Sequence, residues 1–317
     1  MEGLLLAVAA IIVAYNSEAV IGGCLDALAE MAASVTALVI DNASSDRTLA
    51  EVRARTGVSV IANPENRGFA AAVNQGIRAC SAEYLLLLNP DTHILTALDK
   101  MVDASRQYGL ASGKLLDKTG DPQKGFTIRR FPTPLTFWFE LCGLNRLWPS
   151  NPVNRHYRYL DRDLDREASV EQPAGAFLMF RRDVWERLGG LDEDFYPVWF
   201  EDVDFCRRAV DAGYLIEYIP QVAAKHLGGH SVSQISEGCR WRYWCVSLLT
   251  YASKHFGPGG YRSACLAVAL TSVPRTVAGM IRGRSLTPIL SCIKVVGFAV
   301  RRLVSLRRPG EAPKLVS

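Results

Sequence analysis

Two acidic segments of the chain place carboxylates where they could support catalysis. The segment NPD at 89–91 follows the apolar run YLLLL, and the segment EDVD at 201–204 follows Trp199 and Phe200. A carboxylate in an apolar surround can act as a general base on a hydroxyl, and Asp91 could bind Mg²⁺ or Mn²⁺ together with phosphate oxygens. The local sequence equally supports an Asn-Pro-Asp turn and acids that favour the first turn of a helix.

Three other places have residue types suited to nucleotide or metal binding. Asp41 ends an apolar run, and a carboxylate there can accept the N3–H of uracil or thymine. The segment NPENRGF at 63–69 opens a helical pattern, whose N–H groups could hold a diphosphate together with Arg67. His226 follows a further apolar run, and imidazole binds metals. A turn-forming aspartate, a capped surface loop and a core histidine are the alternatives, but the chain order of the set favours one common site.

The elements that must position these residues alternate in type along the first half of the chain. Apolar runs at 4–15, 37–42, 58–63 and 84–91 are separated by helical patterns at 18–31, from Ser44 onward, and at about 68–80. Such alternation predicts βαβ units around a parallel sheet. Ligands of these sheets bind beyond the carboxyl ends of the strands. Those ends all have polar residues: Tyr15-Asn16, Asp41-Asn42, Asn63 and Asn89-Pro90-Asp91.

The second half is less regular. Residues 117–170 contain several prolines, and we expect long loops with one short helix near 135–145. A strand is predicted at GAFLMFRR (175–182), a helix at 201–212 and a strand at YLIEYIP (214–220). The sequence GPGG at 257–260 interrupts the pattern, and a basic, apolar tail follows.

Charge is distributed unevenly over the 317 residues. Residues 257–317 contain ten Lys or Arg and one acid, a net +9, whereas residues 1–256 have a net −5. A basic tail on an acidic body predicts that the tail meets an anionic surface. The acidic body lacks the basic-aromatic patch of a nucleic-acid-binding protein.

The cysteines and the N-terminal sequence predict a cytoplasmic protein. The eight cysteines form no CxxC pair, and we expect them to be reduced thiols. The N-terminal segment lacks the basic region with which a signal peptide begins.

Taken together, these segments resemble the family 2 glycosyltransferases. The matching stretches span most of residues 8–235, and they are IIVAYN, VIDNASSD, NPENRGFAAAVNQGI, LLLLNPDT, GAFLMFRR, GGLDEDFYPVWFEDVDFCRRA and AAKHLGGHS. The resemblance implies the α/β GT-A fold, a Rossmann-like and mostly parallel central sheet flanked by helices. Within the family the chain is most similar to bacterial rhamnosyltransferases that act on polyprenyl-diphosphate-linked sugars, a match that LNRLWPSNPVNRHYRYLD supports.

The resemblance also implies roles for individual residues. Asp202 matches the general base, and Asp91 and His226 match the ligands of a divalent ion, Mn²⁺ or Mg²⁺. Because the usual DXD motif is Asn-Pro-Asp here, only its last residue can be an anionic ligand. His230 stands where relatives often have a small residue, and no role is assigned to it. The implied donor-binding residues are Ala14, Tyr15, Asn16, Asp41, Asn42, Asn66, Arg67, Gly68, Asn74, Asn89 and Asp91. The implied acceptor-side residues are Gly175, Ala176, Trp199 and Glu201.

The implied reaction is an inverting glycosyl transfer. A nucleoside diphosphate sugar, dTDP- or UDP-linked and with dTDP-rhamnose preferred, would donate to a hydroxyl of a lipid-linked or polysaccharide acceptor in cell-envelope synthesis. One alternative is a nucleotidyltransferase that makes nucleotide sugars, but such enzymes have a glycine-rich basic loop where this chain reads AYNSEAVIGG. Another alternative is a non-catalytic sugar-nucleotide-binding protein.

We expect two parts, a catalytic domain at 1–256 and a basic amphipathic tail at 257–317. The apolar stretch 263–281 contains Pro274 and Arg275, and a central arginine is costly in a bilayer. Beyond it, apolar residues recur at three- and four-residue steps, with Lys294, Arg301 and Arg302 off the stripe. The stripe consists of Leu286, Ile289, Leu290, Ile293, Val296, Val300 and Leu303. This pattern predicts an interfacial helix on the anionic cytoplasmic face of the inner membrane. In the alternative, the stripe packs on the body or on a second copy in a homodimer.

Overall fold

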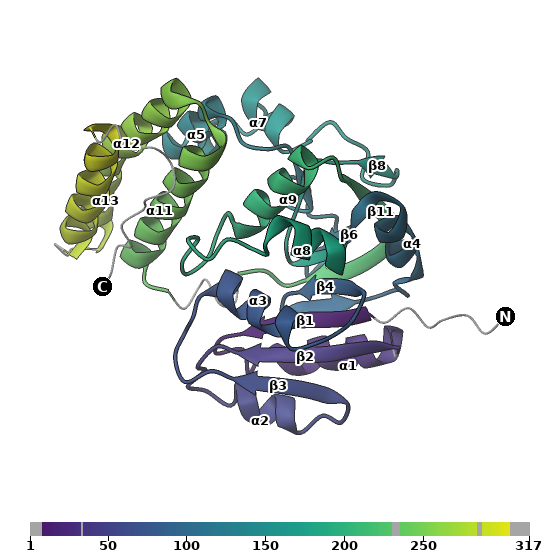
Figure 1. Cartoon of the computed structure of the whole chain (residues 1–317). Helices are drawn as coiled ribbons and strands as arrows, with labels where there is room; N and C mark the ends of the chain where they lie inside the picture. Colours follow the sequence, from purple (N-terminus) through teal and green to yellow (C-terminus); the bar gives the residue numbers. More distant parts are fainter. Residues whose placement is uncertain (1–7, 33, 230–234, 284–286, 305–317) are drawn as a thin grey trace. The chain divides into compact units, whose positions relative to one another are not determined.

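A computed structural model describes residues 8–32, 34–229, 235–283 and 287–304. The predictions for residues 4–7, for His230 and for Leu286 lie outside these ranges. The chain forms two compact units (Figure 1). The first contains residues 1–131, 161–193 and 201–233, and the second contains residues 132–160, 194–200 and 234–317. This grouping does not test the predicted division at residue 256, which stays a prediction.

The first unit is an α/β layer structure with helices on a central sheet, as the sequence predicts (Figure 1). Along the sheet the strand order is β3-β2-β1-β4-β10-β6-β11-β5, with β8 paired to β11. Its strands are β1 (Val8–Ala14), β2 (Val35–Asp41), β3 (Val58–Ala62), β4 (Tyr84–Leu88), β5 (Thr92–Ile94), β6 (Gly109–Leu116), β8 (Ala168–Ser169), β10 (Phe177–Arg181) and β11 (Leu215–His226). A separate ribbon pairs β7 (Ile128–Arg129) with β9 (Gln172–Pro173). The helices of this unit are α1 (Ile21–Met31), α2 (Thr48–Arg53), α3 (Phe69–Arg78), α4 (Asp99–Tyr108), α8 (Arg182–Leu188) and α9 (Glu201–Asp211).

The four predicted apolar runs form β1 to β4, and these four strands are parallel. Every residue of β1 and β4 is buried, which explains why both strands read as continuous apolar runs instead of alternating ones. The helix predicted from Ser44 begins at Thr48, where the Asp46 carboxylate accepts a hydrogen bond from the Thr48 N–H at 2.9 Å. The predicted strand at 214–220 continues to His226, through a change of register between Ile219 and Ala223.

The second unit is helical. It contains α5 (Pro134–Leu141), α6 (Leu144–Leu147), α7 (Pro152–Tyr157), α11 (Glu237–His255), α12 (Pro258–Gly283) and α13 (Thr287–Val304). The prediction of a single short helix between 117 and 170 was wrong, because α6 and α7 follow α5. In α7, Pro152 is the first helical residue, and the Asn151 side chain accepts from the Asn154 N–H at 2.8 Å. This proline therefore starts a helix, although the sequence analysis assigned it to a loop.

Three helices of the second unit pack on one another. α12 and α13 contact each other, and both contact α11. On α13 the packed residues are Val295, Phe298 and Ala299. Within the ranges that the structure describes, no helix combines the length and the apolar character needed to cross a bilayer.

Candidate active site

One edge of the sheet collects most of the predicted site residues. β10 is antiparallel to both β4 and β6, and β11 is parallel to β6. β11 therefore runs in the same direction as β1 to β4. His226 ends β11 and the segment 89–91 follows β4, so both lie at the same edge of the sheet. In addition, His226 is paired directly with Thr92 of β5. The sheet register thus places Thr92, the residue after Asp91, opposite His226, which lies more than 130 positions later in the sequence.

Asp91 and His226 form a buried pair. Their side chains are 5% and 4% exposed, and the His226 Nε2 atom lies 3.5 Å from Asp91 Oδ1. The Leu227 N–H also donates to the Asp91 main-chain oxygen at 3.0 Å. Burial lowers the pKa of His226, and the opposing effect of the Asp91 charge is smaller. The imidazole is therefore neutral at pH 7, which is the form that binds a metal.

The pair fits a divalent ion that is shared with a ligand. Nε2 of His226 is buried and has no hydrogen-bond partner among the described residues, and a buried polar atom of this kind is costly unless something binds it. No group of three or more His, Cys, Asp or Glu side chains that could hold a metal is found in the described part of the chain. Two protein ligands suit Mg²⁺ or Mn²⁺, which take few carboxylates and fill other positions with phosphate oxygens and water.

Asp41 ends β2 beside Ala14, the last residue of β1. It is 3% exposed, and its Oδ2 accepts from the Ser44 N–H at 3.3 Å. Its Oδ1 is buried without a hydrogen-bond partner in the described ranges. This oxygen can therefore accept a ring N–H, as the predicted contact with a pyrimidine requires. Nearby, Asn16 has a positive φ of 46° and accepts from the Ser45 N–H at 2.7 Å.

Asn42 organises the predicted donor loop. Its Nδ2 donates to Asn66 Oδ1 at 2.9 Å, and its Oδ1 accepts from the Arg67 N–H at 3.0 Å. Asn66 Oδ1 in turn accepts from the Gly68 N–H at 2.9 Å. Gly68 has φ of 82°, a conformation that favours glycine, and it immediately precedes α3. These bonds hold the loop against the end of β2 and leave Arg67 exposed at the start of the helix.

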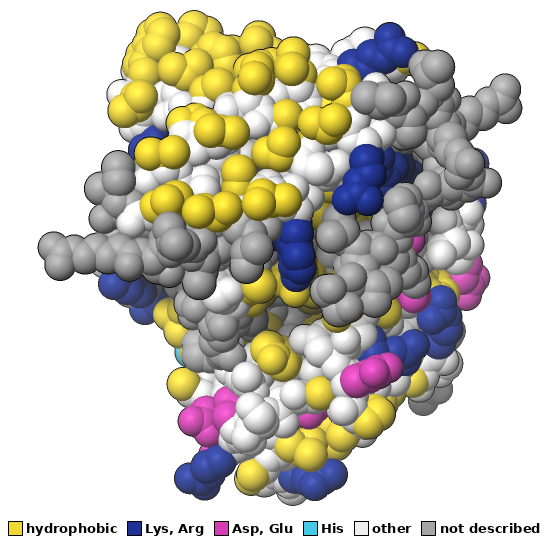
Figure 2. All heavy atoms as spheres, turned by 90° about the vertical axis from the view of Figure 1, so that its left-hand side faces the viewer, with side chains coloured by type: hydrophobic (Ala, Val, Ile, Leu, Met, Phe, Trp, Pro, Cys, Tyr) yellow, Lys and Arg dark blue, Asp and Glu magenta, His cyan; other side chains and the backbone are white. Residues whose placement is uncertain are grey.

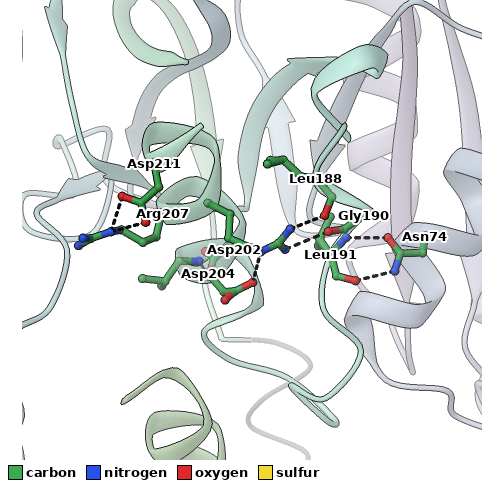
Figure 3. Close-up of polar contacts among 10 residues, drawn as sticks. Asn74, Leu188, Gly190, Leu191, Asp202, Asp204, Arg207 and Asp211 are labelled. Carbon is green, nitrogen blue, oxygen red and sulfur yellow. Dashed lines mark hydrogen bonds and ion pairs between the residues drawn. The ribbon is translucent and has the colours of Figure 1, made fainter. Parts of the chain in front are cut away.

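Asn74 has a different environment from the one that its predicted role suggests. Its amide donates to the Leu191 carbonyl (2.8 Å) and to Glu193 Oε1 (3.0 Å), as Figure 3 shows for Leu191. Its Oδ1 accepts from the Leu191 N–H (2.9 Å) and from Trp185 Nε1 (3.0 Å). Because an asparagine amide has two donors and two lone pairs, its capacity is filled. Asn74 thus joins α3 to the loop after α8, and a direct contact with the donor stays a prediction.

Asp202 lies in the first turn of α9, next to the chain that enters β10. Its Oδ2 accepts from the Gly175 N–H at 2.9 Å, and its Oδ1 accepts from the Val203 N–H at 2.8 Å. One residue further, the Ala176 carbonyl accepts from the Asn89 N–H at 3.1 Å. The segment 175–176 therefore links the predicted base to the chain beyond β4, where Asp91 lies.

Within the same acidic segment, Asp204 forms an ion pair inside α9. Asp204 is fully buried, and its Oδ2 accepts from Arg208 Nε at 2.7 Å (Figure 3). Arg208 also donates to the carbonyls of Leu188 and Gly190. Glu201 is buried. Trp199 belongs to the second unit, and the acceptor-side roles predicted for Trp199 and Glu201 stay predictions.

Two residues beside His226 were missed by the sequence analysis. Gln123 hydrogen-bonds both the ring and the main chain of His226, and the Phe126 ring stacks on the imidazole with centroids 5.1 Å apart and planes 10° apart. Both lie in the stretch that was predicted to be a loop, and no local pattern distinguishes them. They come to the site only through the fold.

Adding a methyl group at Gly175 is expected to displace Asp202. A Cβ there would lie 2.9 Å from Asp202 Cβ and 3.1 Å from Oδ2, so Asp202 must move. A displacement of about 1 Å at a catalytic group can cost roughly 10²-fold, and we expect Gly175→Ala to lower kcat by about 10- to 100-fold with little change in melting temperature. Gly257→Ala is the matched control, since nothing lies within 4 Å of its added Cβ. An unchanged kcat in Gly175→Ala would show that this contact does not position a catalytic group.

The amino-acid sequence is similar to a known protein family and to individual members of known function. The model of the family described as glycosyl transferase family 2 matches residues 9–189. The chain is 28% identical over 215 residues to an N-acetylglucosaminyl-diphospho-decaprenol L-rhamnosyltransferase of Mycobacterium tuberculosis, covering 63% of this chain and 69% of the relative. It is 27% identical over 178 residues to the rhamnosyltransferase WbbL of Escherichia coli, covering 54% of this chain and 62% of that protein.

Solved structures share the fold at low identity. A mannosyltransferase from Pyrobaculum calidifontis, crystallised with GDP-Man and Mn²⁺, is 18% identical with a TM-score of 0.51, over 94% of this chain and 86% of that one. GalNAc-T7, crystallised with UDP, GalNAc and Mn²⁺, is 14% identical with a TM-score of 0.55, over 80% of this chain and 51% of that one. These similarities confirm the predicted GT-A fold.

Proposed function

The chain belongs to glycosyl transferase family 2, and from that premise we propose that it is an inverting transferase that moves rhamnose from a nucleoside diphosphate to a lipid-linked acceptor. The observation on which the proposal depends most is the buried Asp91–His226 pair at the sheet edge where Asp41 and Asp202 also lie. The relatives' names support rhamnose as the sugar and a polyprenyl-diphosphate sugar as the acceptor.

Each end of the donor has a suitable group. The Asp41 oxygen without a hydrogen-bond partner among the described residues would accept the N3–H of thymine or uracil. The start of α3, with its ordered loop and exposed Arg67, would meet the diphosphate. A divalent ion held by Asp91 and His226 would neutralise the charge that develops on the leaving diphosphate.

Asp202 would act on the acceptor. Both of its oxygens accept main-chain hydrogen bonds, which fix the carboxylate in one orientation without neutralising it. It would remove the proton from the acceptor hydroxyl as that oxygen attacks the anomeric carbon. Because attack comes from the face opposite the diphosphate, the configuration inverts and no sugar–enzyme bond forms.

A donor panel tests the proposal. The full chain is incubated with dTDP-rhamnose, UDP-linked and GDP-linked sugars and Mn²⁺ or Mg²⁺, and nucleoside diphosphate release is measured with and without a polyprenyl-diphosphate sugar. We expect acceptor-dependent release of dTDP. Pyrophosphate release from a nucleoside triphosphate and a sugar phosphate would instead indicate a nucleotidyltransferase. Donor binding without any turnover would indicate a non-catalytic sugar-nucleotide-binding protein.

We further propose that the α12–α13 hairpin docks the enzyme on an anionic membrane. Six apolar residues of these helices are 43–63% exposed, namely Leu266, Leu270, Val273 and Val277 of α12 and Ile293 and Val300 of α13. The four on α12 recur at steps of four, three and four residues, which places them on one helix face. Figure 2 views the side of the molecule that includes these helices and shows apolar side chains gathered there with basic ones beside them.

The charge of the hairpin favours lipid over protein as the occupant of this face. Arg262, Arg275, Lys294 and Arg301 are exposed, and no Asp or Glu occurs between 257 and 310. An exposed apolar face on helices whose charged residues are all basic matches anionic headgroups, whereas a self-complementary dimer face would bring like charges together. The predicted stripe on α13 is exposed at Ile293 and Val300, so the helix packs on its neighbours through a different face.

Charge reversal is expected to release the protein from vesicles. The variant Arg262→Glu/Lys294→Glu/Arg301→Glu should lose sedimentation with phosphatidylglycerol vesicles, since each cation near the surface contributes about 1 kcal/mol. Arg53→Glu, an exposed substitution on α2, is the control and should sediment like the wild type. Truncation at residue 256 is less suitable because it would uncover the buried face of α11, which α12 and α13 contact. Equal sedimentation of all variants would remove the hairpin from the proposal, and binding that resists alkaline carbonate would indicate an integral segment.

A further inference from the structure

Gln123 holds His226 at two points with one amide group. Its Nε2 donates to the main-chain oxygen of His226 at 2.7 Å, and its Oε1 lies 3.2 Å from His226 Nδ1. The two residues are 103 positions apart in sequence. Hydrogen bonds to both the main chain and the ring of the same residue constrain that side chain more than either bond alone.

The chemistry of the two groups fixes which way the amide points. The His226 carbonyl can only accept, so the NH₂ of Gln123 must face it. The reversed amide would place two acceptor oxygens against each other at this carbonyl. The Gln123 oxygen therefore faces Nδ1, and because that oxygen can only accept, Nδ1 must carry the proton.

A proton on Nδ1 leaves a lone pair on Nε2 of the neutral ring. Nε2 is the buried atom that faces Asp91 Oδ1 at 3.5 Å and that has no hydrogen-bond partner in the described part of the chain. The opposite tautomer would place an N–H there, which could donate to Asp91 but could not bind a metal. The contact with Gln123 thus decides between an imidazole that binds Asp91 and one that binds an ion together with Asp91.

The surrounding loop keeps Gln123 in place. Its N–H donates to the Leu115 carbonyl at 2.9 Å, and its carbonyl accepts from the N–H groups of Phe126 and Thr127. The same turn places the Phe126 ring parallel to the imidazole, which opposes rotation of the ring. Gln123 and Phe126 therefore fix the ring's proton and its plane, respectively.

We propose that Gln123 is a positioning residue that holds His226 as the Nδ1–H tautomer, so that Nε2 and Asp91 together bind the divalent ion of the donor diphosphate. Metal-binding histidines commonly donate their second ring N–H to a fixed acceptor, and loss of such a partner typically costs about 10- to 100-fold in metal affinity. This inference rests on the metal role of Asp91 and His226 in the proposed function.

The tautomer can be measured without metal or turnover. In the full chain labelled with ¹⁵N-histidine, long-range ¹H–¹⁵N correlation spectra distinguish a protonated from an unprotonated ring nitrogen, and His226→Ala assigns the signals. We expect Nδ1 of His226 to be protonated in the wild type and a mixture of tautomers in Gln123→Met. A wild type with the proton on Nε2 would overturn the inference.

Metal affinity provides the second readout. Calorimetry would measure Mn²⁺-dependent binding of dTDP and of UDP to wild type, Gln123→Met and Gln123→Glu. Gln123→Met should bind about 10- to 100-fold more weakly in Mn²⁺ and equally in EDTA. Gln123→Glu keeps an acceptor for Nδ1–H and should retain the tautomer, but it loses the donor to the His226 carbonyl and should therefore lose less affinity than Gln123→Met without reaching the wild type. It also provides a second variant in case the methionine variant folds poorly. Lys124→Met, an exposed neighbour, is the matched control.

The outcomes separate this inference from the proposed function. Mn²⁺-dependent binding that is lost in His226→Ala but unchanged in Gln123→Met would overturn the role of Gln123 alone. Binding that does not depend on Mn²⁺ in the wild type would overturn the metal role on which both depend. Loss of affinity in Gln123→Glu equal to that in Gln123→Met would show that the bond to the His226 carbonyl matters and that the tautomer does not.

Discussion

Replacing Asp202 with asparagine is expected to leave donor binding intact and to lower the rate of transfer by about 10²–10⁴-fold, the usual contribution of a general base. The substitution keeps the size of the side chain. An asparagine oxygen can still accept from the Gly175 N–H, whereas the bond from the Val203 N–H is lost. The expected loss is therefore one of proton acceptance, and it should appear in kcat with little change in the affinity for the donor.

Asp211→Asn is the matched control for this substitution. It makes the same change at the other end of α9, where Asp211 is exposed and pairs with Arg207 at 3.0 Å (Figure 3). Donor affinity measured by calorimetry and turnover measured by nucleoside diphosphate release separate binding from chemistry. Near-normal turnover in Asp202→Asn would assign the base to another residue, and loss of donor binding would place Asp202 on the donor side.

The sheet and its functional edge could be predicted because their signals are local. Buried parallel strands read as continuous apolar runs, and the polar residues after β1 to β4 mark one edge by strand direction alone. His226 was recognised as the residue after a further apolar run, and the resemblance to the family implied a metal-binding role shared with Asp91. The pairing of β11 with β5 places the two residues together. In these cases the sequence pattern and the tertiary structure agree.

The features that sequence analysis missed depend on contacts between distant segments. Gln123 lies in an irregular stretch, and nothing near it indicates that its amide meets a residue 103 positions later. On α13 the apolar stripe was recognised, but Val295, Phe298 and Ala299 form the packed face, because the neighbouring helices decide which of two apolar faces is covered. The full hydrogen-bonding of Asn74 similarly depends on Trp185 and Leu191.

Removal of the divalent ion is the second change with a large expected effect. EDTA should abolish transfer, and Asp91→Ala and His226→Ala should each weaken binding of the nucleoside diphosphate in Mn²⁺ by at least about tenfold, since even partners of metal ligands contribute that much. The reason is that these two buried side chains face each other at 3.5 Å and, in the proposed function, would hold the ion that binds the diphosphate. The neutral state of His226, which burial favours by lowering its pKa, makes its lone pair available at pH 7.

Comparison of calorimetry in Mn²⁺ and in EDTA distinguishes a metal ligand from a residue that merely supports the fold. A ligand substitution should weaken binding in Mn²⁺ and have no effect in EDTA, where the wild type has already lost the same interaction. A structural substitution should weaken binding in both conditions. His156→Ala, at an exposed position on α7, controls for the loss of an imidazole and should match the wild type throughout. Equal affinity of the wild type with and without Mn²⁺ would contradict the metal role and leave the Nε2 atom of His226 to bind the donor directly.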